Sequence, residues 1–293
     1  MRSFFATLLR QRRRLFVGLL LGWFFILSHS EYLFTGAPMW AVVLTLLIMA
    51  PVFLLPMVAF IMLLPSMRTI VEVLAVNAAL NFALRAALPG VFELFDAYGM
   101  GIVLWLAIFL TVNFSMYGTL LDGLPGWFSY TGRAGFRTKA AASDIFAAFI
   151  PAEGHEGSYR CGTLQYLGPD PDDPESYNVR YAVGEGLFEM QKITPLEDFE
   201  APYRARYYFI GDVTAQNAAF AEGVFDLTIT ELENDTRSVR VIEEHPALRL
   251  RTALFLWFDD HTGDVVNSVR AQVEGKRDFS YTGRFWRKQA KLV

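Results

Sequence analysis

Three groups of polar side chains in the second half of the chain have types that could bind a metal or transfer a proton. The densest contains Asp259, Asp260, His261 and Asp264. Aspartate and histidine are common metal ligands, but this spacing matches neither an EF-hand loop nor a zinc pattern. Acidic residues beside Gly263 are also typical of a helix start, so we expect no metal here.

The other two groups also lack the partners that catalysis requires. Glu243, Glu244 and His245 alternate at the end of a predicted strand, and we interpret them as a solvated edge. His155 and the single cysteine, Cys161, lie in a loop flanked by glycines. A nucleophilic cysteine needs a neighbouring base, and none is placed beside Cys161, so we interpret it as a small half-buried side chain. A lone cysteine fits a reducing compartment.

Motifs and charge exclude further classes of protein. The sequence contains no complete dinucleotide-binding glycine motif, no P-loop and no nucleophile elbow. We therefore predict no catalytic residue, no cofactor and no metal. The net charge is -4, with 30 acidic and 26 basic residues. No basic surface of the nucleic-acid-binding kind is implied, so we predict no nucleic-acid partner.

The elements that must position these groups fall into two parts. Hydrophobic residues make up 53% of the chain and the mean hydropathy is +0.29, which is above the soluble range. The excess is concentrated before about residue 125. Four apolar segments there predict four transmembrane helices: Leu15–Leu27, Pro38–Leu64, Thr69–Leu88 and Met100–Leu121. The third is ambiguous between a span and an interfacial helix, and we expect its Glu72 and Arg85 to be snorkelling or packing groups. We favour an anchor over a transporter.

Basic residues beside short loops predict the orientation. The arginines between positions 10 and 14 place the N-terminus in the cytoplasm, and four crossings return Arg133, Arg137 and Lys139 to the same side. We therefore predict a multi-pass inner (plasma) membrane protein of bacterial type, with both termini cytoplasmic. The predicted divisions are a basic N-terminus (1–14), a four-helix transmembrane region (15–122), an α+β domain (130–278) and a basic aromatic tail (279–293).

The second half predicts an antiparallel sheet with helices at both ends. A helix is expected over Ser143–Ile150, with Ser143 as its N-cap. Expected strands, rich in β-branched and aromatic residues, are Arg133–Lys139, Thr163–Leu167, Val179–Val183, Leu187–Ile193, Tyr203–Ile210, Gly223–Leu232 and Ser238–Glu244. Gly184–Gly186 and Glu233–Asp235 are expected hairpin turns, and Pro169–Ser176 a solvated acidic loop. Pro246–Phe258 and the stretch after Gly263 are predicted helical.

This order of elements resembles a known family. "GRAGFRTKAAASDIFAAFIP" (Gly132 to Pro151) resembles the opening strand and helix of the START-like superfamily, also called SRPBCC or polyketide cyclase-like. "DTRSVRVIEEHPALRLRTALFLWFDDHTGDVVNSVRAQVEGK" (Asp235 to Lys276) resembles its last strand and closing helix. The resemblance covers about residues 130–278 and implies a helix-grip fold, with a curved sheet around a long helix and an apolar cavity between them.

Such a cavity would take a lipid, quinone or isoprenoid, and needs inward-facing apolar and aromatic side chains on alternate strand positions. Tyr181, Tyr207, Phe209, Phe225 and Trp257 are the candidates.

The hexapeptide FSYTGR occurs twice, at Phe128–Arg133 and Phe279–Arg284. Because both copies are aromatic and basic, we expect them near the cytoplasmic membrane face, with Trp127 and Trp286 at the interface. The predicted membrane-surface contacts are Arg133, Arg284, Trp286, Arg287, Lys288 and Lys291. The alternative is that both copies pack against the domain for unrelated reasons.

Three functions remain open. The leading hypothesis is a membrane-tethered domain that binds a hydrophobic ligand for transfer or sensing, because tethering raises the effective concentration of membrane-derived ligands. The second is a structural or assembly subunit of a membrane protein complex. The third is a cyclase-like or hydrolase-like enzyme on the same fold, which needs an acid/base pair inside the cavity.

Overall fold

The structure is a computed structural model, and it describes residues 5, 8–28, 37–122, 126, 128–184, 187–196, 199–211 and 222–291. The chain divides into two compact units. The helical unit is Gln11–Gly123, and the α+β unit is Leu124–Val293 together with Met1–Arg10. Each unit is considered by itself.

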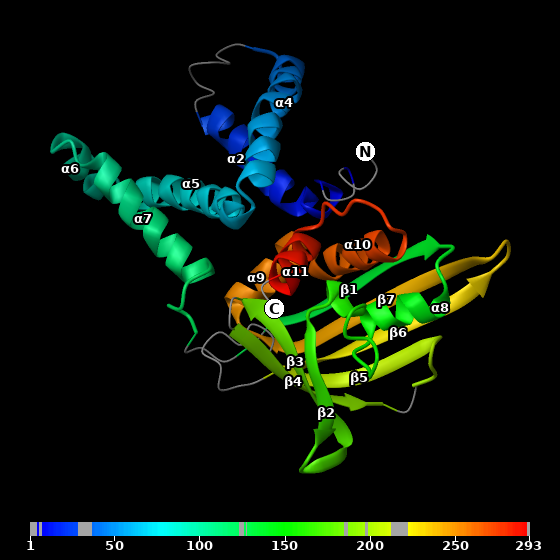
Figure 1. Ribbon diagram of the computed structural model, residues 1–293. Coiled ribbons are helices and arrows are strands. Elements are labelled where there is room, and N and C mark those ends of the chain that lie inside the picture. The colour runs from blue at the N-terminus through cyan, green and yellow to red at the C-terminus, as the bar shows by residue number, and fades with distance from the viewer. Residues whose placement is uncertain are drawn as a thin grey trace. The chain divides into compact units, whose positions relative to one another are not determined.

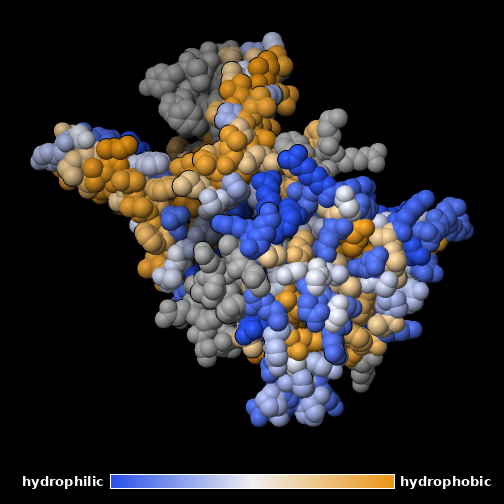
Figure 2. All heavy atoms as spheres, viewed as in Figure 1, coloured by the Kyte–Doolittle hydropathy of each residue, from blue (hydrophilic) through white to orange (hydrophobic). Residues whose placement is uncertain are grey.

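The helical unit consists of helices whose side chains are mostly apolar. Its elements are α2 (Arg12–Ser28), α4 (Met39–Leu63), the short 3-10 helix η1 (Pro65–Met67), α5 (Ile70–Ala87), α6 (Pro89–Ala97) and α7 (Gly101–Met116). Figure 2 shows hydrophobic side chains over much of the surface of these helices. Such a surface is costly in water and stable against other apolar groups or lipid.

Two helical segments in the described part of the chain are long and apolar enough to cross a membrane, not the four that we predicted. They are Met39–Leu63, with 25 residues, and the continuous segment Pro65–Ala87, with 23. The described helices α2 and α7 have 17 and 16 residues, fewer than the roughly 20 that a bilayer core requires. The prediction of four transmembrane helices is therefore corrected to two candidate segments.

Glu72 packs inside the helical unit and does not snorkel, which is one of the two roles that we expected. It is fully buried on α5, and both carboxylate oxygens accept hydrogen bonds from Arg14 of α2, at 2.7 and 2.9 Å. The Tyr117 hydroxyl donates a third hydrogen bond, at 2.6 Å. Arg85, at the other end of α5, is exposed and pairs with Asp96 at 3.2 Å. A buried charge is tolerated only when paired, so the Arg14–Glu72 pair fixes α2 against α5.

The α+β unit begins with a strand and a helix, continues with six further strands and ends with three helices. Its strands are β1 (Phe128–Thr138), β2 (Leu164–Asp170), β3 (Asp173–Gly184), β4 (Leu187–Pro195), β5 (Arg204–Gly211), β6 (Glu222–Leu232) and β7 (Thr236–Leu248). Its helices are α8 (Ala142–Phe149), the 3-10 turn η2 (Tyr159–Cys161), α9 (Leu250–Asp259), α10 (His261–Val273) and α11 (Tyr281–Ala290).

The seven strands form one antiparallel sheet in the order β1-β7-β6-β5-β4-β3-β2. The sheet curves, and α8, α10 and α11 lie on one face of it (Figure 1). A meander from β2 to β7, an opening helix after the first strand and a long closing helix after the last are the arrangement of a helix-grip α+β fold. The fold class predicted for the second half of the chain is confirmed at this level.

Several strands are longer than predicted, and β7 is one of them. We predicted a helix from Pro246, but β7 continues through it to Leu248, which pairs with Phe128 of β1. Proline lacks an N–H to donate, and it is accommodated where the register of β1 shifts between Phe128 and Tyr130.

The acidic segment Pro169–Ser176 is a short hairpin connection, not a long loop. The pairing of β2 with β3 continues to Asp170 and Asp173. Both carboxylates pair with Lys192 of β4, at 3.0 and 3.1 Å. This side chain supplies the positive charge that the acidic segment needs. The other short turn, at Asn234 and Asp235, is confirmed, since Leu232 pairs with Thr236 across it.

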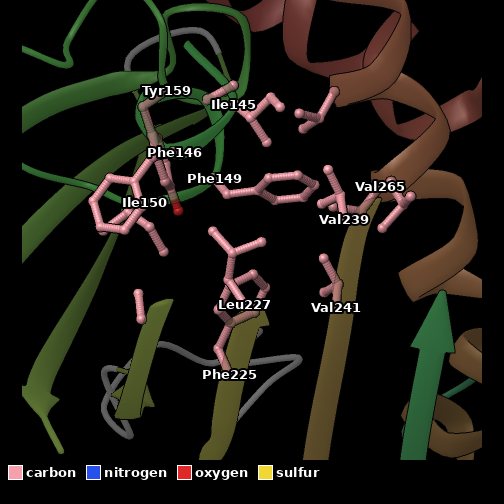
Figure 3. Close-up of a cluster of buried hydrophobic side chains, with 14 of the residues drawn as sticks. Ile145, Phe146, Phe149, Ile150, Tyr159, Phe225, Leu227, Val239, Val241 and Val265 are labelled. Atoms are coloured by element: carbon pink, nitrogen blue, oxygen red, sulfur yellow. The ribbon is translucent and has the colours of Figure 1, made fainter. Parts of the chain in front are cut away.

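The core lies between the inner face of the sheet and the helices. Figure 3 shows Phe149 of α8 pointing toward Val239 and Val265, above Phe225 and Leu227 of the sheet. These side chains alternate with exposed or half-buried neighbours along β6 and β7, as the period of two requires.

The basic aromatic tail after residue 278 contains the helix α11. Ser280 caps α11 by accepting a hydrogen bond from the Gly283 N–H at 3.0 Å. The two FSYTGR copies therefore adopt different structures, a strand in β1 and a helix start in α11. In both copies the glycine lies where an added Cβ would collide with a neighbour, Thr262 for Gly132 and Asp278 for Gly283. Close packing is thus what the copies share.

Replacing Gly283 by alanine is expected to destabilise the α+β unit by about 1–3 kcal/mol, because the new methyl group overpacks the site. The Asp278 carboxylate beside it cannot move aside, since Ser268 and Arg287 hold it at 3.0 and 2.6 Å. Gly157→Ala is the control, because no atom lies within 4 Å of its added Cβ. Thermal unfolding of the full-length protein in detergent measures both, and equal melting temperatures would contradict the packing argument.

Candidate functional site

Four of the five predicted cavity residues lie together on the inner face of the sheet. Tyr181 of β3, Tyr207 and Phe209 of β5, and Phe225 of β6 are all less than 10% exposed. The Tyr207 and Phe225 rings stack with centroids 5.1 Å apart, and Tyr207 meets Phe209 edge to face at 6.3 Å. Contact of these residues with a ligand stays a prediction.

Trp257 does not belong to this group. It lies on α9 and is 45% exposed. Thr252 and Leu256, four residues apart, form the buried stripe of that helix, and the residue after Leu256 is rotated by about 100° from it. The prediction that Trp257 lines an interior cavity is therefore corrected, because its side chain lies on the exposed side of α9.

Two residues of the interior were missed by the sequence analysis, Tyr159 and Arg160. They form η2, in the loop between α8 and β2. Tyr159 is fully buried and stacks on Tyr181, with centroids 5.6 Å apart and planes 18° apart. Neither tyrosine hydroxyl has a hydrogen-bond partner among the described residues. Loop residues have no periodicity, so the only available signal was a tyrosine and an arginine enclosed between Gly157 and Gly162.

A hydrogen-bonded polar group lies beside these aromatic residues. The Glu243 carboxylate accepts from His245 Nε2 at 3.2 Å and from the Thr262 hydroxyl at 3.0 Å. Glu243 is 9% and His245 1% exposed, so they are not the solvated edge that we predicted. The reason is topological: β7 is paired on both sides, and its alternate positions face inward, whereas Glu244 faces outward.

The surroundings of the Glu243 carboxyl favour its charged form. His245 Nδ1 lies 3.1 Å from the Glu222 carbonyl oxygen, and Nε2 faces the Glu243 carboxylate. Both ring nitrogens of His245 thus lie within hydrogen-bond distance of an acceptor oxygen. Burial by itself would raise the pKa of the Glu243 carboxyl, but the His245 hydrogen bond and the positive charges of His261 and Arg160 lower it to about 2.

Asp264, in the first turn of α10, lies in a different environment. Oδ2 accepts a hydrogen bond from the Thr282 backbone N–H at 2.7 Å, while Oδ1 is buried with no partner among the described residues. Burial raises the pKa of the Asp264 carboxyl to about 6, with a further contribution from the negative charges of Asp259 and Asp278. Within the described ranges, no three or more acidic, histidine or cysteine residues are arranged to hold a metal ion.

The predicted membrane-surface residues differ in how exposed they are. Arg133 of β1 and Lys288 and Lys291 of α11 are exposed. Arg287 pairs with Asp278, and Arg284 donates to the Phe279 carbonyl oxygen at 3.0 Å.

Trp286 is 7% exposed and belongs to the hydrophobic core, so we remove it from the surface residues. Trp127 lies outside the described residues.

A surface pocket of about 460 Å³ lies away from the interior. It is lined by the end of β1, including Arg137 and Lys139, and by Glu274 and Lys276 after α10. None of the predicted cavity residues lines it.

No family model matches the chain, and no curated protein matches it. Solved structures similar to it include the Mll3558 protein from Rhizobium loti, with 13% identity and a TM-score of 0.38 over 50% of this chain and 97% of that one. A START superfamily protein from Mycobacterium smegmatis has 12% identity and a TM-score of 0.37, over 50% and 97%. Ara h 8.0201 has 12% identity and a TM-score of 0.38, over 51% and 100%. Because these TM-scores are below 0.5, the fold assignment rests on the strand order and helix positions described above.

Proposed function

We propose that the α+β unit binds a hydrophobic ligand between the sheet and the helices α8 and α10, and that the apolar helices tether it to a membrane. The observation that carries this proposal is the pair of tyrosines, Tyr159 and Tyr181, whose buried hydroxyls lack partners in the described part of the chain. Leaving a buried hydroxyl unsatisfied costs about 1–3 kcal/mol. A bound ligand that supplies an acceptor removes this cost.

The aromatic interior supports the same proposal. Stacked and edge-to-face rings line the inner face of β3, β5 and β6. Ligand sites are characteristically apolar and aromatic with a few polar groups, as here.

The membrane part of the proposal is supported by the apolar segments Met39–Leu63 and Pro65–Ala87. We propose a bacterial inner-membrane location, with the exposed Arg133, Lys288 and Lys291 near anionic headgroups.

The test is native mass spectrometry of the full-length protein, extracted from membranes in detergent, followed by lipid analysis. We expect the protein in the membrane fraction, with one tightly bound lipid, quinone or isoprenoid beyond loosely held detergent and lipid. Ala205→Leu should lose that species, because Ala205 is fully buried beside Tyr207 on the inner face of β5. Ala247→Leu, at an exposed position of β7, should retain it. An empty protein would contradict ligand binding and favour an assembly subunit.

A second candidate function, a cyclase-like or hydrolase-like enzyme, is favoured by one observation. Glu243 and His245 form the buried acid/base pair that such an enzyme needs, and Thr262 bonds to the same carboxylate. Conversion of the bound species by the native protein, absent in Glu243→Gln, would support this alternative.

A further inference from the structure

The guanidinium group of Arg160 is enclosed by three aromatic rings. Its central carbon lies 5.1 Å from the centroid of the Tyr159 ring, 5.5 Å from Trp286 and 5.7 Å from Tyr181. These rings come from η2, α11 and β3, which are distant in the sequence. Such contacts are favourable for a guanidinium because its flat faces meet the rings.

The three rings contact the flat faces of the guanidinium but do not accept hydrogen bonds from its N–H groups. A guanidinium carries five N–H donors in its plane. Within the described ranges, no hydrogen bond or ion pair to Arg160 is found, although its side chain is only half-buried. The nearby carboxylate of Glu243 is already bonded to His245 and Thr262. A cation with no hydrogen bond or ion pair among the described residues therefore lies, half-buried, beside a largely aromatic region.

The backbone is strained to hold Arg160 in this place. Arg160 has φ 42° and ψ 51°, and Cys161 has φ 61°. Left-handed conformations cost about 1–2 kcal/mol for residues with a side chain. Gln272 of α10 stabilises the turn, since its Oε1 accepts from the Cys161 N–H at 3.2 Å and its Nε2 donates to the Ser158 carbonyl oxygen. Strain of this kind is characteristic of residues held for a function.

The hydroxyls of Tyr159 and Tyr181 add two donors to the same region. Burial raises the pKa of both phenols, so each stays protonated and able to donate at neutral pH. Every unfilled group in this region is thus a donor.

We propose that Arg160, Tyr159 and Tyr181 form a receptor for an anionic oxygen head group, a carboxylate or a phosphate, on a ligand whose apolar tail lies against the aromatic interior. This inference rests on the proposed function and names the class of ligand. A carboxylate or phosphate matches the fork of a guanidinium and accepts from both phenols. A neutral head group would offer the Arg160 guanidinium no negative charge and weaker hydrogen bonds.

The test is equilibrium binding of radiolabelled oleate, oleyl phosphate and methyl oleate to the full-length protein in a non-ionic maltoside detergent. The wild type should bind one of the two anions at least tenfold more tightly than methyl oleate, and the preferred anion identifies the head group. Arg160→Gln should lose at least tenfold in affinity for that anion and leave methyl oleate unchanged. Arg160→Lys should recover part of the loss.

Two further variants separate head-group recognition from folding. The double variant Tyr159→Phe and Tyr181→Phe removes unpartnered hydroxyls without changing the packing, so it should stay folded and lose at least threefold in anion affinity. Arg180→Gln is the matched control, because Arg180 also lies over a tyrosine ring, Tyr166 at 6.0 Å, but is exposed. It should bind as the wild type does.

The outcomes distinguish this inference from the function on which it rests. Equal binding of oleate, oleyl phosphate and methyl oleate, unchanged by Arg160→Gln, overturns the head-group receptor and leaves hydrophobic ligand binding intact. Absence of binding by all three, together with no co-purifying apolar molecule, overturns both.

Discussion

Replacing Glu243 by glutamine is expected to lower the free energy of unfolding of the α+β unit by about 3 kcal/mol at pH 7, because two hydrogen bonds to a buried carboxylate are replaced by weaker ones to a neutral amide. His245, which is 1% exposed, would face an uncharged side chain at Nε2 in place of the carboxylate. Weakening the hydrogen bonds of buried polar groups is costly.

The same carboxylate gives the stability a definite pH dependence. The pKa of Glu243 is about 2 in the folded protein, compared with 4.5 as its ordinary value. A lowered pKa means that the stabilisation is complete above pH 4.5 and is lost as the pH falls toward 2, which at about 1.4 kcal/mol per pKa unit corresponds to about 3 kcal/mol.

Urea unfolding of the full-length protein, followed by near-ultraviolet circular dichroism between pH 2 and 7, measures both effects. Glu243→Gln should flatten the profile below pH 4.5. Glu244→Gln, the adjacent outward-facing position, should keep the wild-type profile. A wild-type profile in Glu243→Gln would show that the pair contributes nothing.

Replacing Asp264 by asparagine should stabilise the α+β unit, in contrast to Glu243→Gln. We expect the free energy of unfolding to rise by up to about 3 kcal/mol at pH 8. The pKa of Asp264 is about 6 in the folded protein, against an ordinary value of 3.8. The folded state then holds the proton more tightly, so stability falls as the pH rises from about 4 to 6 and stays lower above it. Asparagine keeps an acceptor for the Thr282 N–H and removes the buried charge.

Hydrogen exchange of the α10 and α11 amides at pH 4 and pH 8 measures this change. Slower exchange is expected in Asp264→Asn at pH 8 and little change near pH 4. Asp144→Asn is the control, because Asp144 occupies the first turn of α8 but is exposed. For Asp144→Asn we expect the free energy of unfolding to fall by at most about 1 kcal/mol, because the favourable interaction with the helix dipole is lost. Faster exchange at pH 8 in Asp264→Asn would contradict a charged, strained Asp264.

The sequence predicted the meander well because alternation of apolar and polar residues is a local property. Phe225 and Leu227 of β6, for example, follow a strict period of two. The ends of elements depend on pairing with distant strands, so β7 was shortened at Pro246 and the helix after it began too early.

The polar part of the site was harder to predict for the same reason. Glu243 and His245 read as an edge because their burial comes from β1, which is more than 100 residues away in the chain but pairs with β7. Arg160 lies in a loop, and only the fold brings Trp286 and Tyr181 to its guanidinium. Interactions of this range leave no pattern in neighbouring residues.

The strand order also has a consequence for synthesis on the ribosome. The first strand made, β1, forms one edge of the sheet, and its only strand partner in the described sheet is β7, the last one made. The chain between the paired residues Thr138 and Arg237 must be translated first, which takes on the order of 5–20 s at about 5–20 residues per second. During that interval β2 to β6 can assemble as a meander, while β1 remains an unpaired strand. The nascent protein therefore depends on a chaperone or another shield for β1 until translation reaches β7.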